Sequence, residues 1–160
     1  MQNSLLIFIH LIAVAIAIGS TFFSIFILLP ELRKSESLNQ PIEDSLELKI
    51  MDRLAPTVLG CVFALIITGV YFLLINYTNQ VNLRPGYFNI FGLKILFVIV
   101  ALGLSVYQTF SLRPRILDLD LRPENKKRLP DTLGFMQTLS QLNLWIISFA
   151  SFFGIFLSRF

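Results

Sequence analysis

The sequence has few charged residues, and the residue types that it lacks exclude several kinds of site. Only 14% of its 160 residues are Asp, Glu, Lys or Arg, whereas a soluble domain carries about 25%. Histidine and cysteine occur once each, as His10 and Cys61. An internal disulfide and most metal-site patterns are therefore excluded. The chain also has no P-loop and no glycine-rich phosphate-binding loop.

Apolar residues are abundant, at 55% of the chain, and the mean hydropathy is +0.73. About 20 consecutive apolar residues suffice to cross a bilayer. The first apolar run is too long for the core of a signal peptide and has no Lys or Arg before it. We expect an all-α, antiparallel four-helix transmembrane bundle that forms a single integral membrane domain, residues 1–160. Its predicted spans cover about residues 5–29, 54–77, 87–112 and 132–158.

The basic residues predict the orientation of the chain, because Lys and Arg accumulate in cytoplasmic loops. Only Arg84 and Arg159 fall on the face that carries the termini. The two long connections carry the others outside the spans, namely Arg33, Lys34, Lys49, Arg53, Arg113, Arg115, Arg122, Lys126, Lys127 and Arg128. We therefore expect cytoplasmic long loops and extracytoplasmic termini, in a bacterial inner membrane. This placement accounts for the net charge of +3 through contact with the lipid bilayer, without a nucleic-acid partner.

His10 and Lys94 are the only basic residues inside the predicted spans. A charge at that depth costs on the order of 3 kcal/mol, so such a residue indicates a functional site. At about 1.5 Å per residue, both lie roughly 8–10 Å below the outer interface. Each also lies on the small and polar stripe of its helix, the face by which membrane helices associate. We therefore predict that the two side chains share a cavity near the extracytoplasmic rim.

Two structural alternatives remain for these side chains. Lys94 can extend its stem to the outer head groups. His10 can be a neutral imidazole that is hydrogen-bonded to a hydroxyl or carbonyl group of the next helix. No Asp or Glu lies within a span to orient His10, so the sequence does not predict a hydrolytic site.

The single imidazole limits the cofactors that one chain can bind. A haem with two histidine ligands is excluded, but a five-coordinate haem b on His10 remains, with Lys94 opposite it or near a propionate. Copper needs soft or imidazole ligands. The candidates besides His10 are Cys61 and three methionines at the chain ends or toward the inner face. Two identical chains would supply one imidazole each.

Four segments of the chain resemble the CopD-like and HemJ-like family of four-helix integral membrane proteins. HLIAVAIAIGSTFFSIFILLPEL is similar to the first span of these proteins, RLAPTVLGCVFALIITGVYFLL to the second and GLKILFVIVALGLSVYQTF to the third, and QLNLWIISFASFFGIFL is a weaker match to the fourth. The specific features are the early His10, Arg53 at the second span and Lys94 early in the third. The resemblance implies that His10 is the cofactor or metal ligand, with Arg53 and Lys94 as its charged partners.

The resemblance implies two functions. HemJ-like proteins are associated with protoporphyrinogen IX oxidation and with haem bound through the early histidine, and CopD-like proteins with copper transport or resistance. We place haem or porphyrin binding through His10, in a redox role, ahead of copper handling. A third hypothesis is a non-catalytic subunit of a larger membrane complex, or a homo-oligomer. Catalytic residues and enzyme status stay open.

Overall fold

The computed structural model describes residues 2–37, 46–77, 87–121 and 128–157. Within these ranges all regular structure is helical. Four stretches are long and apolar enough to cross a membrane, namely Ser4–Lys34, Lys49–Tyr71, Asn89–Leu119 and Leu129–Leu157. Helices form here because a bilayer offers no partner for an unpaired backbone group, and a helix satisfies those groups within its own segment. The predicted all-α fold with four membrane-crossing helices is confirmed.

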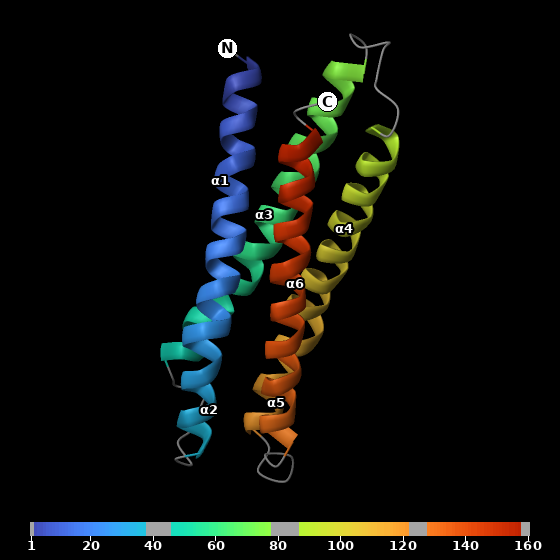
Figure 1. Ribbon diagram of the computed structural model, residues 1–160. Coiled ribbons are helices and arrows are strands. Elements are labelled where there is room, and N and C mark those ends of the chain that lie inside the picture. Colours follow the sequence, from blue (N-terminus) through green and yellow to red (C-terminus); the bar gives the residue numbers. More distant parts are fainter. Residues whose placement is uncertain (1, 38–45, 78–86, 122–127, 158–160) are drawn as a thin grey trace.

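The four long helices form a closed ring of neighbours. They are α1 (Gln2–Phe23), α3 (Leu46–Tyr77), α4 (Tyr87–Tyr107) and α6 (Leu129–Leu157). α1 packs against α3 and α6, and α4 packs against the same two helices from the other side. Both ends of the chain lie at the same end of the bundle (Figure 1). This arrangement leaves a space in the half of the bundle that holds the termini, where side chains of all four helices meet.

The first and third spans extend beyond their predicted ends. The first continues through the π-helix η1 (Ser24–Leu28) into α2 (Leu29–Ser37). The third continues through a second π-helix, η2 (Gln108–Leu112), into α5 (Arg113–Leu121). α2 and α5 lie at the end of the bundle opposite the termini (Figure 1). The helix does not stop at Pro30, just after the predicted end of the first span, because this proline lies inside α2.

Each π-helix ends two residues before a proline, which explains why the helix continues past it. In an α-helix, a proline ring collides with the carbonyl group four residues earlier and removes one backbone hydrogen bond. Here the residue just before each proline donates its backbone N–H to the carbonyl group five residues earlier. Leu29 N–H donates to Ser24 O, and Arg113 N–H donates to Gln108 O. The wider π turn accommodates Pro30 and Pro114 without ending the helix.

α3 begins eight residues earlier than the predicted start at about Leu54, and Pro56 lies inside it. The added turns pack onto a core cluster at the end of the bundle opposite the termini. This inner cluster consists of Leu28, Leu29, Leu32, Met51, Leu112, Ile116, Leu119, Leu129, Leu133 and Met136. A second cluster, Ala17, Val62, Ala101, Ile146 and Ile147, lies nearer the termini and shares three residues with the lining of the cavity described below.

Candidate functional site

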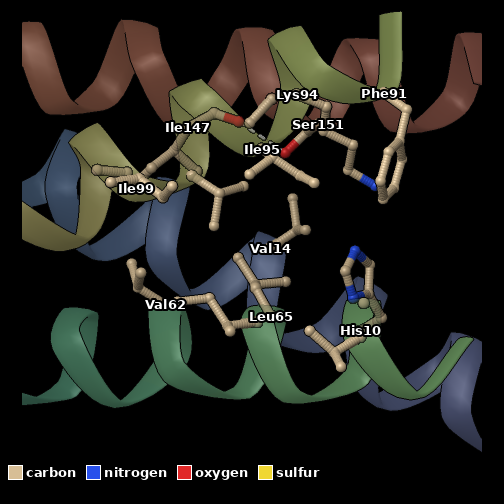
Figure 2. A pocket seen from close by; sticks show the side chains of 16 residues that line it. His10, Val14, Val62, Leu65, Phe91, Lys94, Ile95, Ile99, Ile147 and Ser151 are labelled. Atoms are coloured by element: carbon tan, nitrogen blue, oxygen red, sulfur yellow. Dashed lines mark hydrogen bonds between the residues drawn. The ribbon is translucent and has the colours of Figure 1, made fainter. Parts of the chain in front are cut away.

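A cavity of about 220 Å³ lies between α1, α3, α4 and α6. Among the residues that the structure describes, the lining is apolar apart from His10 of α1, Lys94 of α4 and Ser151 of α6. The Ser151 hydroxyl donates to Ile147 O at 2.8 Å, a bond within its own helix. The polar groups that remain for a ligand are therefore an imidazole and an ammonium group. Figure 2 shows both turned toward one another at the end of the cavity where Phe91 lies.

A hydrogen bond to α3 fixes the orientation of His10. The Thr68 hydroxyl donates to Ala64 O at 2.6 Å, as serine and threonine in helices often do. Thr68 Oγ1 also lies 2.7 Å from His10 Nδ1, and a hydroxyl that donates to a carbonyl can still accept. We assign the proton to His10 Nδ1, because in this tautomer the Thr68 hydroxyl keeps its bond to Ala64 O and accepts from the imidazole. In the neutral ring Nε2 keeps its lone pair, and this nitrogen faces the cavity (Figure 2).

Lys94 reaches the cavity over a glycine of α6. A Cβ atom at Gly154 would lie 3.2 Å from Lys94 Nζ and 3.6 Å from Lys94 Cε. Gly154 therefore leaves room for the end of the lysine side chain. Within the part of the chain that the structure describes, no acidic side chain lines the cavity. An ammonium group in such surroundings favours an anionic ligand group, because little water is present to screen it.

The structure thus brings His10 and Lys94 into one cavity, as their depths in the spans predict. The sequence offered a hydroxyl or carbonyl group of the next helix as a partner of His10, and the structure shows the Thr68 hydroxyl in that role, but sequence reasoning did not identify Thr68. The depth of Thr68 in its helix is the signal that could have identified it, because it is close to the depth of His10. Thr68 lies nine residues before the end of α3, about 14 Å at the helical rise, and His10 lies eight residues after the start of α1, about 12 Å.

Arg53 is not brought to the other two predicted site residues. It is exposed, near the start of α3, and its carbonyl accepts a hydrogen bond from the Thr57 hydroxyl at 2.7 Å. Nine residues separate it from Val62, the nearest lining residue of α3, which is about 14 Å along a helix. The neighbouring residue, Asp52, instead forms an ion pair with Arg113 that ties α3 to α5.

The donor set does not fit a copper ion bound by one chain. Cys61 does not line the cavity, and Met51 and Met136 are buried in the inner cluster. Among the described residues, no three His, Cys, Asp or Glu side chains are grouped as metal ligands. Lys94, if charged, would repel a cation beside His10. The same set fits an iron porphyrin better, because haem requires a single proximal histidine and carries carboxylates for the ammonium group.

These features define an integral membrane protein of the four-helix class, with a histidine–lysine cavity in the half of the bundle that holds the termini. Residues 48–157 match the family of copper resistance protein D, CopD, so the chain belongs to the CopD family. The matched region includes Thr68 and Lys94, but it begins after α1 and therefore does not include His10. No curated protein and no solved structure matches the chain.

Proposed function

We propose that this protein binds haem, or a related porphyrin, through His10 in a redox role. The observation that carries the proposal is the position of His10, whose Nδ1 contacts Thr68 Oγ1 and whose ring faces the Lys94 side chain inside an apolar cavity (Figure 2). Haem proteins commonly hold iron by one imidazole whose other nitrogen donates a hydrogen bond. His10 is held in that way by Thr68.

Different residues of the cavity can each contact a different part of a porphyrin. His10 Nε2 would hold the iron, and Lys94 would offer its ammonium group to a propionate. The aliphatic lining contributed by α3 and α4 would contact the porphyrin ring. When bound, haem supplies one-electron chemistry at its iron, while the chain orients the imidazole through Thr68 and excludes water with its apolar side chains.

Haem binding can be tested on the purified protein. Hemin is titrated into wild-type protein and into the His10→Ala variant, and the Soret band is followed. We expect a shifted Soret band for the wild type and a loss of at least tenfold in affinity for the variant. Ser20→Ala serves as the matched control, because Ser20 lies on the same helix and does not line the cavity. A wild-type protein with no Soret band after reconstitution would overturn the proposal.

Copper handling is the second candidate function, and membership of the CopD family favours it. Since one chain offers a single imidazole, this function requires ligands from a second copy or from a partner protein. The test measures the bound copper of the purified protein and the copper tolerance of cells with wild-type or His10→Ala protein. Unchanged tolerance together with no bound copper argues against this candidate.

We further propose that the termini face the extracytoplasmic side of a bacterial inner membrane. The excess of Lys and Arg in the two long connections supports this orientation. Because both termini lie at the same end of the bundle (Figure 1), they then share the extracytoplasmic side. The His10 cavity then lies in the outer half of the bilayer. Labelling of an engineered cysteine near either terminus by an impermeant maleimide tests this orientation in intact spheroplasts, and labelling only after lysis would contradict it.

A further inference from the structure

The cavity is open on one side, between α3 and α4. Three residues of its lining are exposed, and they come from these two helices: Val70 of α3 (51%), and Ile95 (42%) and Ile99 (59%) of α4. The lining residues of α1 and α6 are buried or half-buried. In Figure 2, α3 and α4 border the cavity on two sides, with His10 and Lys94 reaching into it.

This opening lies at the depth of the hydrocarbon core. Ile95 is eight residues from the start of α4, and the helical rise puts it about 12 Å below that end. Ile99 is one turn deeper. The hydrocarbon core is about 30 Å thick, so exposed aliphatic side chains at these positions contact acyl chains. The open side of the cavity therefore faces lipid.

The cavity is too small for a whole tetrapyrrole. An engineered cavity of about 150 Å³ binds benzene, and pockets for drug-sized ligands enclose about 300–1,000 Å³. A space of about 220 Å³ therefore holds little more than one ring of a larger molecule. The remaining part of a porphyrin has to extend through the open side, where the apolar edges of α3 and α4 and the acyl chains receive it.

We propose, on the basis of the function proposed above, that the ligand enters sideways from the bilayer between α3 and α4. The occupant is a membrane-dissolved tetrapyrrole with carboxylates. Its apolar body matches the exposed aliphatic rim, and its acidic group matches Lys94, the one cationic side chain in the lining. Val70 and Ile99 border the passage, and His10 lies at its inner end.

The test compares bulky substitutions at the opening with matched substitutions on the same helices. Ile99→Trp narrows the opening from α4. Its control is Leu96→Trp, because Leu96 is 56% exposed on α4 but does not line the cavity. Val70→Trp and its control Ile67→Trp repeat the comparison on α3, where Ile67 is 67% exposed and also lies outside the lining. Each protein is reconstituted into liposomes and mixed with liposomes that carry hemin.

The measured quantity is the rate at which the Soret band of bound haem develops. We expect a decrease of at least tenfold for Ile99→Trp and Val70→Trp, and a change of less than twofold for the two controls. Ile99→Ala, which widens the opening, is expected to bind haem at least as fast as the wild type. If Ile99→Trp and Val70→Trp bind haem as fast as their controls, the inference is overturned. That result would indicate that haem enters from the aqueous phase or that a second copy of the chain covers this face. A wild type that never develops the band would overturn the haem proposal itself, and the two failures are therefore distinguishable.

Discussion

Replacing Thr68 by valine removes one hydrogen-bond acceptor and leaves the shape of the side chain nearly unchanged. In the wild type, Thr68 Oγ1 accepts the His10 Nδ1 proton at 2.7 Å. Thr68 is only 7% exposed, so water does not readily replace the lost hydroxyl. The imidazole then keeps an unpaired N–H group, or changes to the tautomer that places its proton on Nε2 and blocks ligation.

Both outcomes weaken the ligand bond. Partners that orient a ligating histidine contribute about 10–100-fold to affinity, which corresponds to about 1.4–2.7 kcal/mol. We therefore expect Thr68→Val to bind hemin at least tenfold more weakly than the wild type in a Soret titration. Thr68→Ser keeps the hydroxyl, and we expect its affinity to lie within threefold of the wild type.

A spectroscopic measurement separates this role from a general loss of packing. The hydrogen bond to Nδ1–H makes the imidazole a stronger donor, so the iron–histidine stretching frequency of the ferrous protein should fall in Thr68→Val and recover in Thr68→Ser. Equal hemin affinity and an equal frequency in Thr68→Val and the wild type would refute the assignment of Thr68 as the orienting partner of His10.

Three further predictions concern Lys94 and the inner end of the bundle. Lys94→Met removes a hydrogen bond to a charged group, worth about 1.5–3 kcal/mol, so hemin should bind ten- to hundredfold more weakly, while a porphyrin dimethyl ester should bind equally to both proteins. Gly154→Leu places a side chain where Lys94 Nζ lies and should reproduce that loss in a hemin titration, whereas Gly103→Leu should not, because a Cβ there meets no atom within 4 Å. Asp52→Asn breaks the ion pair with Arg113, in which the Asp52 side chain is 30% exposed and the Arg113 side chain 29%. Unfolding in mixed micelles should show a loss of about 1 kcal/mol, with unchanged hemin affinity because the pair lies outside the cavity.

The proline positions show how far local sequence rules reach. A proline after an apolar run predicts the end of a helix, and by that rule the first span ends at Pro30. The structure continues the helix to Ser37 by inserting a π turn. That turn is stabilised by burial of Leu28, Leu29 and Leu32 in the inner cluster, which involves residues far apart in the sequence. No local pattern contains this information.

The faces of the second span show the same limit. The inward side of this helix is predicted by the small and polar residues Thr57, Cys61, Ala64, Thr68 and Tyr71. Thr68 is buried, but Thr57 is exposed and Tyr71 is 44% exposed. Val58 and Val62 are buried instead. Lipid is as apolar as the core, so hydrophobic periodicity carries little information about which side of a membrane helix faces its neighbours.

The sequence by itself determined the number of membrane-crossing helices and the common level of His10 and Lys94. Helix length, helical rise and the cost of a buried charge are local properties, and they can be read along one segment. Only the tertiary structure decided that Thr68 is the partner of His10 and that the cavity opens between α3 and α4. These facts depend on the rotation of each helix about its axis, which is set by side-chain packing among four segments that are distant in the chain.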